Sequence, residues 1–282
     1  MERLATGYGL IEGPVWDQAH GLYFSDVING GVFLLDPAGK VSPAIAKRRG
    51  VGGMALHAAG GLIVGGRDIA CVSLTDGTTK SLLALDAITG ATGFNDLTTD
   101  AAGRIYVGSL AFRVFSGEAI KPGHLHVIDL DGRRRTLSDG VLLTNGMGFS
   151  PDGRLLYHCD SRGPHVRVYD ARPDGSVGPW RKFASLGEAG VPDGMKVAVD
   201  GSVWVADAQG GRVAVFEPDG RHRRDIAVPL PMVTSLCFGG ADLHDLYIVT
   251  GSRGGPDENC GSVFRVRAEV AGLPLPQARV AV

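Results

Sequence analysis

The chain lacks any long apolar segment. None of its 282 residues belongs to an uninterrupted apolar run long enough, at about 18 residues, to span a bilayer. Residues 1–13 also lack the basic start and apolar stretch of a secretory signal. We therefore expect neither membrane insertion nor export, and the cytoplasm is the expected location.

Cysteine and clustered positive charge are also scarce. The four cysteines lie far apart and show neither CxxC nor mixed Cys/His ligand spacing, which argues against a disulfide framework and a thiolate zinc site. The one basic cluster, residues 133–135, follows a turn and has no interleaved aromatic residues, so no nucleic-acid partner is expected. A formal net charge of −2 and 44% hydrophobic residues fit a soluble domain with a sizeable core.

Long amphipathic helix patterns with caps are missing as well, which argues against an α/β barrel of this length. The sequence instead contains 43 glycines, which recur beside short β-branched and aromatic runs and therefore separate strands. Six copies of one unit, a turn followed by a hydrophobic strand, are found: "GLYFSDV", "GLIVGG", "GRIYVGSL", "GRLLYHCD", "GSVWVAD" and "DLYIVTG".

The starts of these six units are separated by 40, 42, 50, 48 and 44 residues. This spacing is typical of a four-stranded propeller blade. The sequence therefore predicts an all-β protein, a six-bladed β-propeller with four-stranded antiparallel blades, forming a single domain over residues 1–282. Residues 2–6 are expected to pair with the last blade and close the ring, which removes an open sheet edge.

Polar residues recur at one place upstream of the turn glycine. Asn95, Asn145 and Asp193 each lie eight residues before it, Glu12 lies nine before it, and Gly53 takes the place in the second unit. An insertion blurs the register of the sixth unit. Because the first strand of each propeller blade lines the central channel, these four oxygen-bearing side chains are expected to converge there.

Converging carboxylate and amide oxygens suit a hard divalent cation such as Ca²⁺, Mg²⁺ or Mn²⁺. Any one of these residues, taken alone, is an ordinary turn residue, because Asn and Asp before glycine favour turns. The shared register favours a metal site over four unrelated turns. In "TNGMGFSPDG" the polar start of a strand is thus explained as one wall of the channel, and Gly146 is expected to let the backbone bend there.

Several long motifs also resemble a known family. The segments "EGPVWD", "FNDLTTDAAGRIYVG", "TNGMGFSPDGRLLYHCDS", "PDGMKVAVDGSVWVADAQGGRV" and "TSLCFGG" are similar to the senescence marker protein, gluconolactonase and luciferin-regenerating enzyme family, from about residue 12 to residue 265. The resemblance implies a six-bladed propeller that binds one catalytic divalent metal (Ca²⁺, Mn²⁺, Zn²⁺, Mg²⁺ or Fe²⁺) and hydrolyses lactones.

The resemblance also implies roles for individual residues. Glu12, Asn145 and Asp193 match the family's metal ligands, and Asp193 also matches its general base. Asn95 and Asp96 match an Asn-Asp pair whose asparagine faces substrate and metal. The implied reaction is opening of a cyclic ester, with the metal as Lewis acid on the carbonyl oxygen and Asp193 taking a proton from water.

One position departs from the family pattern. Gly93 stands where the sugar-lactone hydrolases of this family typically have an arginine that binds substrate hydroxyls. This departure favours a less polar lactone or ester as the substrate. The segment 109–123 is longer than a hairpin turn and is a candidate lid, in which Arg113 is the candidate replacement. An ordinary long connection between strands is the alternative.

Two further functions stay open at the level of sequence. A channel cation can be structural, so the protein is alternatively a non-catalytic calcium-binding or interaction propeller. A hydrolase of other esters, including organophosphates, would use the same metal and differ only in the pocket walls. No membrane partner is expected, and a monomer or a weak homo-oligomer is the expected assembly.

Overall fold

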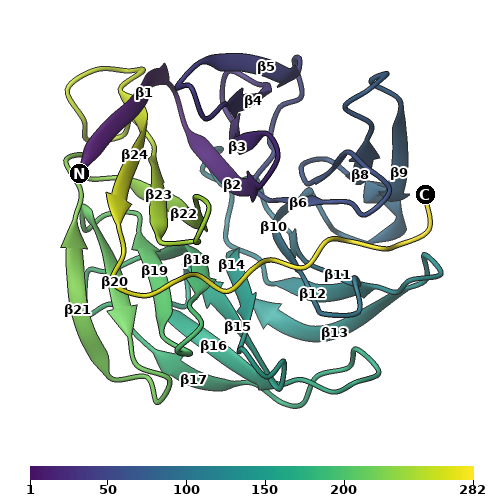
Figure 1. The fold of residues 1–282 in the computed structure, drawn as a ribbon. Coiled ribbons are helices and arrows are strands. Elements are labelled where there is room, and N and C mark those ends of the chain that lie inside the picture. Colours follow the sequence, from purple (N-terminus) through teal and green to yellow (C-terminus); the bar gives the residue numbers. More distant parts are fainter.

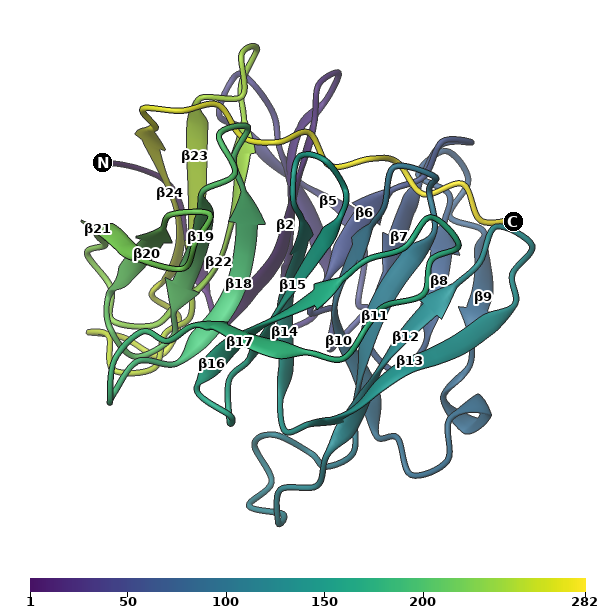
Figure 2. The same cartoon turned by 90° about the horizontal axis from the view of Figure 1, so that it is seen from below.

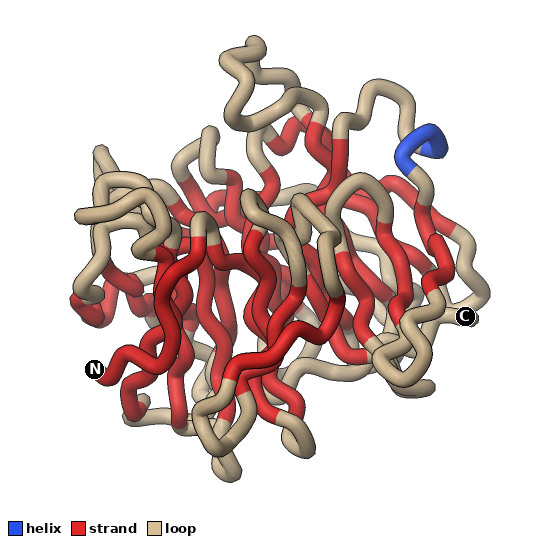
Figure 3. The backbone as a smooth tube through the Cα atoms, turned by 90° about the horizontal axis from the view of Figure 1, so that it is seen from above, coloured by secondary structure: helices blue, strands red, loops and turns tan.

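The structure, a computed structural model, describes residues 1–282 and contains six four-stranded antiparallel sheets arranged in a ring (Figure 1). This is the six-bladed propeller that the repeat spacing predicts. Strands dominate the fold, and the only helical element is the short 3-10 turn η1, Leu85–Ala87 (Figure 3). No helix in the structure is long and apolar enough to cross a membrane.

Each of the first five blades uses four consecutive strands, and the sixth takes its outer strand from the N-terminus. From the central axis outward, the blades are β2 (Ile11–Asp17), β3 (Gly21–Asp26), β4 (Val32–Leu35), β5 (Val41–Ile45); β6 (Met54–Leu56), β7 (Leu62–Val64), β8 (Ile69–Val72), β9 (Thr79–Leu83); β10 (Gly93–Thr99), β11 (Ile105–Leu110), β12 (Gly123–Ile128), β13 (Arg134–Val141); β14 (Thr144–Phe149), β15 (Leu155–Asp160), β16 (His165–Asp170), β17 (Arg181–Ala184); β18 (Pro192–Val197), β19 (Val203–Asp207), β20 (Arg212–Phe216), β21 (His222–Ala227); and β22 (Val233–Gly239), β23 (Asp245–Thr250), β24 (Gly261–Arg267), β1 (Glu2–Tyr8).

The turn glycines that mark the repeat have a steric cause. Gly21 and Gly61 adopt φ angles of +118° and +89°, which favour glycine. A Cβ atom at either position would also overlap a carbonyl oxygen of the third strand in the same blade, at Leu35 and Val72 respectively. At these two positions the close approach of the third strand thus adds to the need for glycine, whereas Gly103, Gly153 and Gly201 share the positive φ but meet no carbonyl oxygen of the third strand.

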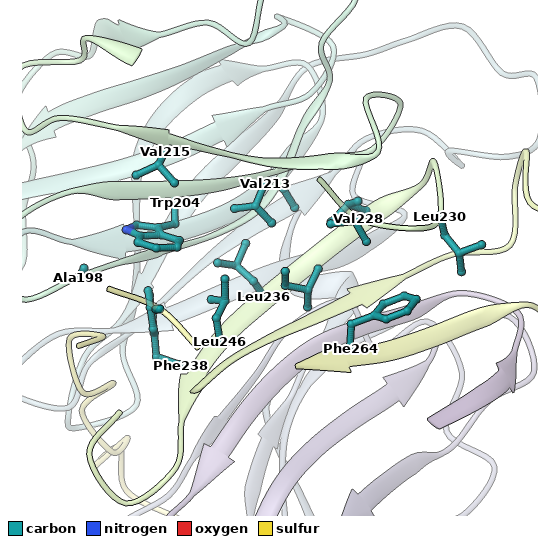
Figure 4. Close-up of a cluster of buried hydrophobic side chains, with 14 of the residues drawn as sticks. Ala198, Trp204, Val213, Val215, Val228, Leu230, Leu236, Phe238, Leu246 and Phe264 are labelled. Atoms are coloured by element: carbon teal, nitrogen blue, oxygen red, sulfur yellow. The ribbon is translucent and has the colours of Figure 1, made fainter. Parts of the chain in front are cut away.

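The core lies between neighbouring blades, where the apolar faces of twisted sheets meet. Between blades 5 and 6, Trp204 and Phe238 pack edge to face with ring centroids 5.2 Å apart, and Leu246 and Val213 belong to the same buried cluster (Figure 4). Such aromatic pairs add about 0.5–1.5 kcal/mol beyond the burial of their area. Packing of this kind fixes each blade, and hence each inner strand, relative to the next.

The N-terminal strand closes the ring, as the sequence predicts. β1 pairs antiparallel with β24, from Glu2 opposite Arg265 to Tyr8 opposite Gly261. The paired segment is therefore slightly longer than the predicted residues 2–6. It covers the edge of blade 6 that would otherwise be free to pair with another chain.

The C-terminal residues 268–282, which we call the C-terminal strap, cross one face of the ring (Figure 1). Backbone N–H groups of Leu273, Ala278 and Arg279 donate hydrogen bonds of 2.8–2.9 Å to carbonyl groups in blade 5, in blade 2 and in the turn before β11 of blade 3. The long loop between β11 and β12 projects from the opposite face (Figure 2). The two faces of the propeller are thus distinct.

Candidate active site

The predicted site residues sit at irregularities of the inner strands. The pairing of the first strand with the second shifts register next to Glu12 in blade 1, beside Asn95 in blade 3, beside Asn145 in blade 4 and beside Asp193 in blade 5. A β-bulge inserts an extra residue, bends the strand and re-aims a side chain. Equivalent bulges in four blades therefore explain why polar residues recur at one place in the repeat.

Glycines beside these bulges allow the inner strands to approach one another. A Cβ at Gly146 would overlap the backbone nitrogen of Met195 on the next inner strand, and a Cβ at Gly194 would overlap the side chain of Ser235. Gly146 does not have a positive φ. The strand does bulge after Asn145, but the need for glycine at 146 comes from this close approach and not from the bend that the sequence suggested.

Four predicted residues line one cavity of about 360 Å³: Glu12, Asn95, Asn145 and Asp193. Glu12, Asn145 and Asp193 are almost fully buried, with exposed fractions of 9%, 8% and 7%. A volume of this size is in the range of small-molecule sites, which combine apolar walls with a few convergent polar groups.

A larger cavity, of about 560 Å³, lies among blades 3 to 5 and the C-terminal strap. None of the predicted site residues lines it. We assign the site to the smaller cavity, because only there do buried carboxylates and amides from several blades converge.

Hydrogen bonds fix the two amides. The Nδ2 of Asn95 donates to Oδ1 of Asn145 at 2.7 Å and to the carbonyl of Thr144 at 2.8 Å. The Nδ2 of Asn145 donates in turn to the hydroxyl of Ser161 at 2.8 Å, which donates to the carbonyl of Pro192 at 2.6 Å. This chain runs across blades 3, 4 and 5, so the Asn145 side chain has little freedom to rotate.

Each buried carboxylate disfavours the charged form of its neighbours. Burial, followed by the charges of Asp193 and Asp96, raises the pKa of Glu12 well above its usual range. Burial and the charge of Asp96 do the same to the pKa of Asp193, against a hydrogen bond from the Gly194 backbone. Buried like charges are costly without a compensating cation.

The residues present fit a divalent cation. The Oδ1 atom of Asp193 is buried and has no hydrogen-bond partner, so a strong acceptor is left unsatisfied by the protein. No three His, Cys, Asp or Glu side chains lie together in a metal-binding arrangement. The protein ligands would therefore be the carboxylates of Glu12 and Asp193 and the amide oxygen of Asn145. Three protein oxygens leave coordination positions open, as catalytic metal sites require.

Two predicted residues do not line the cavity. Asp96 is buried, its Oδ1 accepts a 2.8 Å hydrogen bond from its neighbour's N–H at Leu97, and it influences the site through its charge. Arg113 is exposed and pairs with Glu118 at 3.2 Å. Its loop nevertheless reaches the cavity, where Phe115 forms part of the wall.

Arginines that no motif indicated do line the cavity. Arg162 follows β15 in blade 4, and Arg253 follows β23 in blade 6. The guanidinium carbon of Arg253 lies 5.4 Å from the ring centroid of Phe115. Gly93 does not line the cavity. Because both arginines stand in loops outside the repeat, their sequence positions carried no signal.

Three buried aspartates support the same three blades. Asp26, Asp160 and Asp207 each end the second strand of the blade that carries Glu12, Asn145 or Asp193, and all three are at most 2% exposed. In each blade the carboxylate accepts a hydrogen bond from the backbone N–H two residues before the candidate ligand, at Leu10, Leu143 or Val191. We call these residues the anchor aspartates.

The anchor aspartates also hold the loop that follows the second strand. Asp26 accepts from the N–H of Ile28, Asp160 from that of Gly163 and Asp207 from that of Gln209. Each carboxylate thus ties together the two backbone segments that flank its candidate ligand. Their recurrence in "FSD", "HCD" and "VAD" was visible in the sequence, but nothing there distinguished an anchor from a turn residue.

Asp160→Ala is expected to lower the free energy of unfolding by about 3–5 kcal/mol. The variant removes the acceptor of the part-buried N–H of Leu142 and the buried N–H of Leu143. It also leaves Arg167, which lies 2.7 Å from Asp160 and has a 4% exposed side chain, without its carboxylate partner. Urea unfolding measures the loss. Asp152→Ala, in an exposed turn of the same blade, is the control and should change stability by about 0.5 kcal/mol or less.

An equal loss in the two variants would contradict an anchoring role for Asp160.

The fold and the cavity define a six-bladed propeller with a buried polar site at one end of its central axis. A family profile described as "SMP-30/Gluconolactonase/LRE-like region" matches residues 10–252. The chain belongs to this family of lactonase-type hydrolases.

Two individual relatives agree with this membership, and a solved structure agrees with the fold. The chain is 30% identical over 283 residues to pentonolactonase XacC of Haloferax volcanii, covering 95% of this chain and 94% of the relative. It is 31% identical over 277 residues to a 6-deoxy-6-sulfogluconolactonase of Pseudomonas putida, covering 94% and 93%. The structure of a calcium-binding protein, regucalcin, from Agrobacterium tumefaciens superposes with a TM-score of 0.88 at 21% identity, covering 99% and 97%.

Proposed function

We propose that the protein is a divalent-metal-dependent lactonase that opens a sugar lactone in the cavity lined by Glu12, Asn145 and Asp193. The observation that carries the proposal is the buried, unpartnered Oδ1 of Asp193 beside a second buried carboxylate. Sugar lactones are the named substrates of both lactonase relatives, and a calcium-binding protein shares the fold.

Glu12, Asn145 and Asp193 would hold the cation. When bound, the cation supplies Lewis acidity toward the lactone carbonyl oxygen and offsets the two buried negative charges. Asn95 is held 2.7 Å from Asn145 and lines the cavity, so its amide is placed to contact substrate. The apolar wall, including Leu143 and Met232, limits the access of bulk water.

Asp193 acts as the general base in this proposal. Its carboxylate takes a proton from water as the water oxygen bonds to the carbonyl carbon. The ring C–O bond then breaks, and the proton passes to the departing alkoxide, which gives a hydroxy acid; this product releases a proton to the solvent near neutral pH and becomes a hydroxy carboxylate. Burial favours a base of this kind because it raises the pKa of Asp193, whereas a bound cation lowers it. Because the two effects oppose one another, they bring the pKa of Asp193 nearer to the pH at which the protein works.

A non-catalytic calcium-binding propeller is the second candidate function. The calcium-binding protein of similar fold favours it. An open cavity above the candidate ligands speaks against it, because structural metal sites are closed by protein ligands. The two functions therefore differ in whether the bound cation activates a substrate.

A pH-stat assay of metal-stripped protein tests the proposal. The protein is reloaded with Ca²⁺, Mn²⁺, Zn²⁺, Mg²⁺ or Fe²⁺ and offered sugar lactones, alkyl lactones, aryl esters and an organophosphate. We expect at least one cation to restore sugar-lactone hydrolysis, with the stripped protein nearly inactive. Cation binding without turnover of any substrate would favour the non-catalytic candidate.

A further inference from the structure

The two cavity arginines have no acidic partners. Arg162 and Arg253 are both exposed, and neither forms an ion pair or a hydrogen bond within the protein. Two other arginines of blades 4 and 5 do have acidic partners: Arg167 pairs with the anchor Asp160, and Arg212 pairs with the anchor Asp207. The guanidinium groups at the cavity are therefore free to bind a ligand.

The charges that line the cavity balance only without a cation. Glu12 and Asp193 contribute two negative charges, and Arg162 and Arg253 contribute two positive charges; the remaining lining residues are uncharged. A divalent cation on the two carboxylates cancels their charge and leaves the two guanidinium charges uncompensated. A cavity with low-dielectric walls and an excess of one sign attracts ligands of the opposite sign.

The positions of these arginines separate them from the candidate ligands. They stand in loops of blades 4 and 6, whereas Glu12 and Asp193 come from inner strands of blades 1 and 5. Phe115, from the loop of blade 3, packs against Arg253 and limits the volume that its guanidinium sweeps. An anionic group would therefore be bound at the mouth of the cavity, while the ring carbonyl lies deeper.

We propose that the substrate is an anionic sugar lactone, whose carboxylate, sulfonate or phosphate group, remote from the ring carbonyl, is bound by Arg162 and Arg253. This inference rests on the proposed function of the cavity. Guanidinium groups bind such anions through charge-assisted, often bidentate hydrogen bonds. The proposed anionic lactone differs from the less polar substrate that Gly93 suggested. Position 93 lacks an arginine, but Arg162 and Arg253 in other loops supply positive charge at the cavity.

A matched substrate pair tests the inference. D-Glucono-1,4-lactone and D-glucaro-1,4-lactone share one ring and differ at C6, which is a hydroxymethyl group in the first and a carboxylate in the second. Hydrolysis of both is measured with cation-loaded wild type, Arg162→Gln, Arg253→Gln and the double variant. Gluconolactones carrying sulfonate or phosphate at C6 then identify which anion is preferred.

We expect wild type to favour at least one of the anionic lactones by about tenfold or more in kcat/KM at low salt. The double variant should lose most of that advantage, so that the ratio of its kcat/KM values for the anionic and the neutral lactone falls toward one, because glutamine carries no positive charge. The wild-type advantage should also shrink as ionic strength rises. Arg67→Gln removes another exposed arginine without an ion pair, outside the cavity, and should change neither value.

A calorimetric titration of D-glucarate into the same variants gives a readout that needs no turnover. Weaker binding to the double variant than to wild type is the expected result. Hydrolysis of neutral and anionic lactones at equal rates, with no change in the double variant, would overturn the inference and leave the proposed lactonase function intact. If no lactone is hydrolysed, the proposed function fails, and unchanged D-glucarate affinity in the double variant then overturns the anion site as well.

Discussion

Replacing Asp193 by asparagine is expected to lower kcat/KM for lactone hydrolysis by about a thousandfold, with the protein still folded. Asparagine has nearly the same shape, so the bulge in β18 and the close packing at Gly194 are preserved. The variant would lose the proposed proton acceptor and one of the two charges that would hold the cation. Steady-state kinetics at saturating cation separate the loss of the base from a loss of metal affinity.

The control for this variant is Asp219→Asn. Asp219 lies in the exposed turn between β20 and β21 of the same blade and pairs only with Arg221, at 2.8 Å. Its replacement should leave kcat/KM within about twofold of wild type. If Asp193→Asn kept a tenth or more of the wild-type rate at saturating cation, Asp193 would not be the base.

Metal-free protein is expected to lose stability as pH rises through the raised pKa values of its buried carboxylates. The folded protein holds the pKa values of Glu12 and Asp193 above their unfolded values, which lie near 4. Between the two pKa values the native state binds more protons than the unfolded state, so metal-free protein loses stability as pH rises through that interval. Each unit of pKa difference corresponds to about 1.4 kcal/mol.

Thermal or urea unfolding of chelated protein at about pH 5.5 and pH 8 measures this effect. We expect a higher melting temperature at the lower pH, and excess divalent cation should raise stability most at the higher pH. Asp193→Asn removes one of the charges and should flatten the profile of the metal-free protein. Aspartates with lowered pKa, such as Asp160 and Asp200, lose their stabilisation only at more acidic pH. Stability that rises with pH in the metal-free protein would contradict the explanation.

The fold was predictable because its cause is repeated. A turn glycine with a positive φ recurs just before or at the start of the second strand in each of the first five blades, and six repeats at blade-length spacing leave few other architectures. The convergence of Glu12, Asn145 and Asp193 followed from the same register. The periodicity of the sequence thus predicts which residues occupy equivalent positions in different blades.

Features outside the repeat were not predictable. Arg113 stands in the right loop but points its charge toward Glu118, and sequence spacing says nothing about such a local ion pair. Arg162 and Arg253 reach the cavity only because of how two loops fold over it. The C-terminal strap has no strand pattern, since its backbone bonds join it to several blades in turn.

The pairing of β1 with β24 bears on how the chain is made. Strand β1, Glu2–Tyr8, is synthesised before the other strands of the ring and finds its partner Gly261–Arg267 only after the intervening residues have been made. At typical elongation rates that delay is on the order of tens of seconds. Earlier blades can form during this time, but the ring stays open and β1 stays unpaired. Nascent chains of this protein should therefore depend most on protection from aggregation at the strand that finally closes the ring.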